Sequence, residues 1–271
     1  MLVVNSMVSK TRNKTHKNFY IENQEYSKFI DKLDVISYSK YIEKIESLDL
    51  HGKYFLDVGC GTGKVITKLN KNIKTFGLEV SRSHIKLAKK NRTENFILFD
   101  GEKFPFKRSS FDCCGSFTVL EHVEKPKLFI NEVLKIVKNQ GYIIIVCPNF
   151  LALSNSYHHS TKGFFRKIEN FLITISKIFR YSILRKELSF DSMKPIKNKQ
   201  FKPDDDAITK TNPIDIIYFL RKNNVKIIYY SSTIYENSNK IFQFLKDIPF
   251  IKLFFGGVFI IGKNELGGNL C

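Results

Sequence analysis

The chain has 271 residues, of which 43% are hydrophobic, and its formal net charge is +18. This length and composition are typical of a globular protein with a sizeable core, and they allow one large α/β domain with an insertion. The five cysteines lack zinc-site spacing, which argues against a structural zinc centre. The positive charge has two explanations: an AT-rich coding sequence, or an anionic partner such as nucleic acid or a membrane surface.

Residues 1–50 are predicted to form a tail followed by helices. Residues 1–18 are polar, and we expect them to be disordered. Residues 19–48 place apolar side chains at helical spacing, which predicts one or two helices near a ligand cleft. The apolar start at residues 1–4 is too short for a targeting sequence, so we expect a cytoplasmic protein.

Residues 55–64 predict a strand, a glycine-rich turn and the start of a helix. Asp57 interrupts the short apolar strand, and Gly59, Gly61 and Gly63 follow it. Glycine suits such a turn because the backbone bends sharply there and a ligand must approach it closely. The pattern therefore predicts a ligand-binding turn at the start of a doubly wound α/β domain.

Two phosphate-binding patterns do not fit this turn. A P-loop requires Gly where Val58 stands and Ser or Thr where Val65 stands. A dinucleotide fingerprint requires Gly at the position of Lys64. The remaining pattern is G-x-G-x-G after an acid, and Lys64 is interpreted as a solvated helix residue.

Further motifs follow in a fixed order along the chain. They are a strand over 73–80 that includes Glu79; a strand over 96–99 followed by Asp100-Gly101; the runs E-K-F-P-F at 102–106 and S-F-D at 110–112; a strand over 113–120 followed by L-E-H-V; the run 135–141; and a strand over 142–147. Together with the turn, this series closely resembles the class I S-adenosylmethionine (SAM)-dependent methyltransferases. Within that class it is most similar to the methyltransferase type 11 group, which includes ubiquinone and menaquinone biosynthesis enzymes.

The resemblance implies a Rossmann-like three-layer sandwich with a seven-stranded, mostly parallel sheet and an antiparallel last strand. It also implies SAM as the co-substrate. Glu79 would accept hydrogen bonds from the ribose hydroxyls, and Asp100 would contact the adenine amino group, with Gly101 and Glu102 in the same pocket. The turn with Asp57, Gly59, Gly61 and Gly63 would hold the amino-acid portion of SAM.

His122 is the candidate catalytic residue, and two readings of it stay open. An imidazole titrates near neutral pH, so His122 suits a general base or a hydrogen-bond partner of the acceptor. It equally suits a structural role at the start of the next helix. His158 and His159 form a pair without a third ligand nearby in the sequence, so we interpret them as loop residues and predict no metal site.

Residues 151–205 interrupt the alternation of strands and helices and are predicted to be a basic, apolar insertion. Residues 162–202 contain eleven Lys or Arg and three Asp or Glu, a net charge of +8. Their longest uncharged run, 170–176, is too short to span a bilayer. Three interpretations remain for the apolar helical stripe here: a lid over the substrate, a helix on anionic lipid, or a nucleic-acid contact.

The rest of the chain completes the sheet. We expect a helix from Pro213, a strand over 225–230, a further helix over 241–253 and a last antiparallel strand over 257–262. The predicted segments are therefore residues 1–50, the SAM-binding core 51–150, the insertion 151–205 and the completion of the sheet 206–271.

The sequence predicts a SAM-dependent methyltransferase that modifies a small-molecule or lipid-like acceptor, most readily at oxygen or carbon. Peripheral membrane contact through residues 162–202 is part of this hypothesis. One alternative is an RNA or protein methyltransferase that uses the basic surface, although the N/D-P-P-Y/F motif of amino-directed enzymes is absent. The other is a non-catalytic SAM-binding module.

Overall fold

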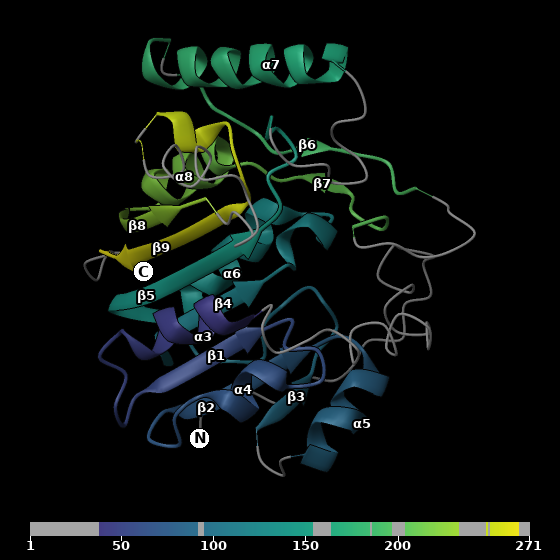
Figure 1. Ribbon diagram of the computed structural model, residues 1–271. Coiled ribbons are helices and arrows are strands. Elements are labelled where there is room, and N and C mark those ends of the chain that lie inside the picture. Colours follow the sequence, from purple (N-terminus) through teal and green to yellow (C-terminus); the bar gives the residue numbers. More distant parts are fainter. Residues whose placement is uncertain are drawn as a thin grey trace. The chain divides into compact units, whose positions relative to one another are not determined.

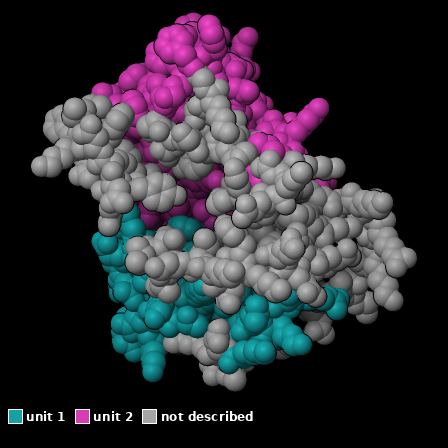
Figure 2. All heavy atoms as spheres, turned by 45° about the vertical axis from the view of Figure 1, so that its right-hand side comes forward, with its two compact units in different colours: residues 1–117, 128–143 teal, residues 118–127, 144–271 magenta. Residues whose placement is uncertain are grey.

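The computed structural model describes residues 38–91, 95–153, 164–184, 186–196, 204–232, 248 and 250–265 (Figure 1). These residues belong to two compact units, coloured separately in Figure 2. Unit 1 comprises described residues up to Phe117 together with residues 128–143. Unit 2 comprises residues 118–127 and the described residues from Ile144 onward. The predicted division into four segments stays a prediction.

The helices and strands follow the predicted alternation. In chain order they are α3 (Ser39–Glu46), β1 (Tyr54–Val58), α4 (Lys64–Lys68), β2 (Lys74–Glu79), α5 (Arg82–Asn91), β3 (Phe96–Leu98), β4 (Phe111–Phe117), η2 (Leu120–His122), α6 (Pro126–Ile136), β5 (Val137–Cys147), α7 (Phe164–Ser182), β6 (Asp191–Ser192), β7 (Thr209–Lys210), α8 (Pro213–Lys222), β8 (Val225–Ser231), η3 (Ile251–Leu253) and β9 (Val258–Asn264). The predicted helices within residues 19–37, and most of the one over 241–253, lie outside the described residues.

Seven strands form one sheet in the order β3-β2-β1-β4-β5-β9-β8. Strand β1 pairs in parallel with β2 and with β4, and β2 pairs in parallel with β3. Strand β9 lies between β5 and β8 in the strand order and is antiparallel to β8. The predicted mostly parallel sheet with an antiparallel last strand is therefore confirmed.

Two strand boundaries differ from the sequence prediction. Strand β4 covers residues 111–117 rather than 113–120, because the chain turns into the short helix η2 at Leu120. Strand β5 begins at Val137 rather than Tyr142. No proline lies within the added residues 137–141, and Gln140 has a φ of 61°, so the strand includes one residue with left-handed backbone.

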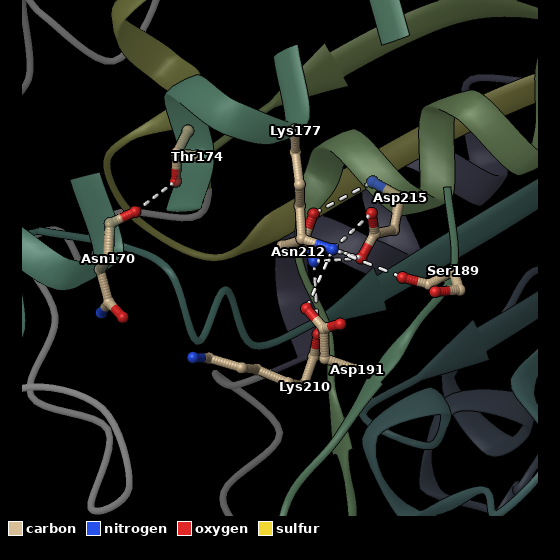
Figure 3. A network of polar contacts seen from close by, with 8 residues as sticks. All are labelled: Asn170, Thr174, Lys177, Ser189, Asp191, Lys210, Asn212 and Asp215. Carbon is tan, nitrogen blue, oxygen red and sulfur yellow. Dashed lines mark hydrogen bonds and ion pairs between the residues drawn. The ribbon is translucent and has the colours of Figure 1, made fainter. Parts of the chain in front are cut away.

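In unit 2, helix α7 turns a polar face inward. Its buried residues are Asn170, Thr174 and Lys177, which share one side of the helix. The Nζ atom of Lys177 lies 2.9 Å from an oxygen of Asp215 and 2.9 Å from Oδ2 of Asp191 (Figure 3). Asp215 is almost completely buried, so this ion pair fixes the side of α7 that faces α8.

The start of α8 positions Asp215. Asn212 is the N-cap: its side-chain oxygen accepts a hydrogen bond from the Asp215 amide at 3.0 Å, and Pro213 follows at the first helical position. The Asn212 amide group also donates to Oδ2 of Asp215 at 2.7 Å (Figure 3). The cap therefore holds the carboxylate in place for Lys177.

Removal of the Lys177 charge should destabilise unit 2 strongly. A Lys177→Ala variant leaves the Asp215 carboxylate buried without its cation, which typically costs about 3–5 kcal/mol of unfolding free energy. Lys222→Ala is the matched control, because Lys222 pairs with the exposed Glu187 at the surface, where ion pairs typically contribute about 0–1 kcal/mol. Urea unfolding measures both. Equal losses in the two variants would contradict the structural importance of the Lys177 pair.

Candidate functional site

The turn between β1 and α4 is tied to the neighbouring strand β2. The amides of Gly59 and Cys60 donate to the Leu78 carbonyl at 2.7 and 3.2 Å. The Gly61 amide donates to Oε2 of Glu79 at 2.9 Å. The φ angles of Gly59, Gly61 and Gly63 are 72°, 52° and 79°, values that residues with a side chain rarely adopt. The predicted glycine turn and Glu79 are thus one local structure.

Gly63 also needs to be glycine because of its packing. A Cβ atom at this position would lie 2.6 Å from the Phe96 ring. Phe96 begins β3 and packs in a buried cluster with Cys60, Ile66, Ile85 and Ala88. This cluster packs α4 and α5 against the strands, and its Phe96 ring lies next to Gly63 of the turn.

Glu79 is buried and ionised. Its Oε1 accepts hydrogen bonds from the amides of Val80 at 2.8 Å and Ser81 at 2.9 Å. Burial alone would raise the pKa of Glu79, but the imidazole of His84 and the backbone amides outweigh this effect and lower the pKa from its ordinary value. The end of β2 therefore presents a negative charge that is held by several donors.

Asp57 is a buried residue of β1, and its environment differs from that of Glu79. Burial raises its pKa to about 7, the hydrogen bond from Tyr41 opposes this rise, and the negative charge of Glu79 adds to it. The Tyr41 hydroxyl donates to Oδ1 of Asp57 at 3.2 Å. A cationic group bound at this turn would favour the charged form of Asp57.

Asp100 shapes the loop after β3. Its Oδ1 accepts hydrogen bonds from the amides of Glu102 at 2.9 Å and Lys103 at 3.4 Å. Gly101 has a φ of 82°, which this tight turn requires. Asp100 is half-buried, whereas Gly101 and Glu102 are exposed. The predicted residues of this loop thus belong to one turn, and their contacts with a nucleoside stay a prediction.

The residues of unit 1 fit SAM as a co-substrate. The hydroxyl oxygen of Thr62 is buried and has no hydrogen-bond partner among the described residues, so the turn offers a polar group for a ligand. Thr62 was not among the predicted site residues, because a residue between two glycines carries no distinctive sequence signal. With the negative charge of Glu79, the turn offers what an amino-acid tail and a ribose require.

His122 lies in unit 2 among carboxylates. Its Nδ1 is 3.4 Å from Oδ2 of Asp206, and its Nε2 is 3.7 Å from Oε1 of Glu121. Burial, followed by the neighbouring charge of Asp204, raises the pKa of Glu121 well above its ordinary value. Burial likewise raises the pKa of Asp204, and the charge of Asp206 adds to this rise. The sequence analysis did not connect Asp204 and Asp206 with His122, because these two acids are distant from it in the chain.

Comparisons with known proteins assign the family. Residues 56–145 match the family model of a methyltransferase domain. A protein of Methanocaldococcus jannaschii whose function is uncharacterized is 34% identical over 176 residues, which are 63% of this chain and 80% of that protein. The chain belongs to the SAM-dependent methyltransferases. SAM is therefore its co-substrate.

Two further relatives are informative about the family and the fold. The methyltransferase is 32% identical over 135 residues to a mitochondrial ubiquinone biosynthesis O-methyltransferase of Dictyostelium discoideum, and the match covers 42% of each chain. It also resembles the crystal structure of a SAM-dependent methyltransferase from Aquifex aeolicus. That structural match has a TM-score of 0.53 and 12% identity, and it covers 89% of this chain and 98% of the other. At this identity the structural likeness shows the fold alone.

A Glu79→Ala variant should bind SAM at least tenfold more weakly. The change removes the carboxylate that would accept the ribose hydroxyls and that orders the Gly61 amide, and a hydrogen bond to a charged group contributes about 1.5–3 kcal/mol. Asp49→Ala is the control, because Asp49 is an exposed acid of the same unit. Calorimetry with SAM compares the variants. Unchanged affinity in a folded Glu79→Ala variant would refute the assignment of Glu79.

Proposed function

We propose that this methyltransferase transfers the methyl group of SAM to an oxygen or carbon of a lipid-like small molecule and that it works at a membrane surface. The observation that carries the proposal is the outer face of α7. Phe164, Phe165 and Leu172 are 73%, 85% and 60% exposed, although large apolar side chains normally lie inside a protein. The sequence similarity to an enzyme of ubiquinone biosynthesis supports an acceptor of this kind.

The exposed face of α7 is broad. It contains the large apolar residues Phe164, Phe165, Ile168, Phe171, Leu172, Ile175 and Phe179. In Figure 1, α7 is drawn as a long helix beside α8 within unit 2, and the two helices are in contact. The buried residues of α7 are the polar Asn170, Thr174 and Lys177, whereas an ordinary surface helix buries its apolar side. An apolar face of this kind suits the interface of a bilayer.

Charge complementarity supports an anionic bilayer as the proposed occupant of this face. Arg166, Lys167 and Arg180 are exposed on α7, which has Glu169 as its single acid. Basic residues near an anionic membrane surface contribute about 1 kcal/mol each. No helix of the described residues is long and apolar enough to cross a membrane. The proposed contact is therefore one in which α7 lies in the plane of the interface.

The chain's contribution to methyl transfer is binding and orientation. SAM supplies an electrophilic methyl group when it is bound. In the proposal, Glu79 holds the ribose, Asp100 and its loop hold the adenine, and the turn with Asp57 and Gly61 holds the amino-acid portion. These contacts fix the direction in which the methyl group is presented to the acceptor, and fixed geometry accounts for much of the rate of such reactions.

The alternative that a specific observation favours is a nucleic-acid or protein acceptor, because the net charge of +18 would attract an anionic polymer. A methyl-transfer assay separates the candidates. Labelled SAM is incubated with the enzyme and a cell extract that is then fractionated into lipid, RNA, protein and small molecules. We expect label in the lipid or small-molecule fraction. Label confined to RNA or protein would refute the proposal, and SAM binding without any transfer would support a non-catalytic module.

The membrane contact has its own test. A Phe165→Asp/Leu172→Asp double variant should co-sediment far less with anionic vesicles than the wild type, because it places charge on the apolar face of α7. Leu128→Asp is the matched control, since Leu128 is 56% exposed on α6. Co-sedimentation should fall with rising salt, as the basic residues are screened. The role of α7 would be refuted if the double variant and the Leu128→Asp control sedimented equally with anionic vesicles and equally with neutral vesicles.

A further inference from the structure

Two segments of unit 2 that are distant in the sequence meet around His122. The Ile208 amide donates to the Glu121 carbonyl at 2.9 Å, and the Thr209 hydroxyl donates to the Val123 carbonyl at 2.7 Å. These bonds hold the segment that begins at Asp204 against η2. Hydrogen bonds to backbone carbonyls therefore fix the segment that carries Asp204 and Asp206 relative to His122.

The Glu121 side chain accepts no hydrogen bond from the other described residues of this cluster. Its side chain is completely buried, and neither carboxylate oxygen accepts a hydrogen bond from another described residue. The Nε2 atom of His122 lies 3.7 Å from Oε1, which is beyond hydrogen-bonding distance. Buried polar groups are nearly always satisfied, so two buried side-chain oxygens without a hydrogen-bond partner are unusual. Glu121 therefore indicates a missing ligand.

The geometry around Glu121 suits a metal ion. Glu121, His122 and Asp204 each offer a ligand atom, and these three atoms all lie within 4.8 Å of one another. Ligands about 2.0–2.2 Å from one ion lie up to about 4.4 Å apart. Small side-chain rotations would therefore bring all three atoms to one cation.

The remaining nitrogen of His122 has a carboxylate neighbour as well. Its Nδ1 lies 3.4 Å from Oδ2 of Asp206. Histidines that bind metals through one ring nitrogen usually donate the other N–H to a carboxylate or carbonyl, which fixes the ring orientation. Asp206 is in the position for this supporting role.

We propose that Glu121, His122 and Asp204 bind one divalent cation and that Asp206 orients His122. One imidazole and two carboxylates suit Mn²⁺ or Zn²⁺ better than Ca²⁺ or Mg²⁺, which favour oxygen ligands throughout. In this arrangement His122 is a metal ligand, and the general-base role from the sequence analysis no longer applies to it. Three protein ligands leave positions for water or for an acceptor oxygen.

The test is a titration of the EDTA-treated full chain with Mn²⁺. The electron paramagnetic resonance signal of free Mn²⁺ measures how much of the ion stays unbound. Mn²⁺ is chosen because it binds thiolates weakly, so the cysteines do not interfere. We expect saturation at one ion per chain. Glu121→Gln and Asp204→Asn should each weaken binding at least tenfold, and Asp206→Asn should weaken it by about 10–100-fold. Glu187→Gln, an exposed acid of the same unit, should bind like the wild type.

Thermal unfolding without metal separates loss of the site from loss of the fold. Glu121→Gln should melt at the same temperature as the wild type or higher, because it removes a buried carboxylate. Mn²⁺ should raise the melting temperature of the wild type and not that of Glu121→Gln. Absence of saturable Mn²⁺ binding, or equal affinity in wild type, Glu121→Gln and Asp204→Asn, would overturn the proposal. Neither result depends on SAM or on an acceptor, so the proposed function is tested separately.

Discussion

The hydrogen bond from the Gly61 amide to Glu79 is the interaction on which the co-substrate site of unit 1 depends. It joins the turn after β1 to the end of β2, the two positions at which doubly wound proteins bind nucleosides. The bond requires a glycine backbone on one side and a buried carboxylate on the other. Phe96 then packs beneath Gly63, so that the turn has support from the core as well as from β2. The predicted SAM contacts all lie on or beside this frame.

A second constraint determines the character of unit 2. Lys177 is buried on α7 and pairs with Asp215, so the polar side of the helix must face inward. The apolar side then has no place in the core and faces outward. This reversal links one buried ion pair to the proposed membrane contact, because the same helix with its apolar side inward would be an ordinary lid.

Much of unit 1 could be predicted from the sequence because its signals are local. The turn, Glu79 and Asp100 are recognised by their order and spacing, and the strands of the sheet follow the expected alternation. Strand ends are predicted less accurately than strand centres, as the start of β5 at Val137 shows. Thr62 was missed, since only its burial reveals an unsatisfied hydroxyl.

The features of unit 2 required the three-dimensional structure. Periodicity shows that α7 has an apolar stripe, but it does not show which face is buried, and the partner of Lys177 is 38 residues away in the chain. The same holds for Asp204 and Asp206, whose neighbours Glu121 and His122 belong to another part of the sequence. Long-range electrostatic pairs of this kind leave no spacing pattern.

A crystal structure of the chain with S-adenosylhomocysteine, the product of methyl transfer from SAM, tests the central claim most directly. The account predicts that both ribose hydroxyls lie within hydrogen-bonding distance of the Glu79 carboxylate, that the adenine lies beside Asp100, and that the amino-acid portion lies on the turn at residues 59–63. A nucleoside bound elsewhere on the chain, with the Glu79 carboxylate away from the ribose, would contradict it.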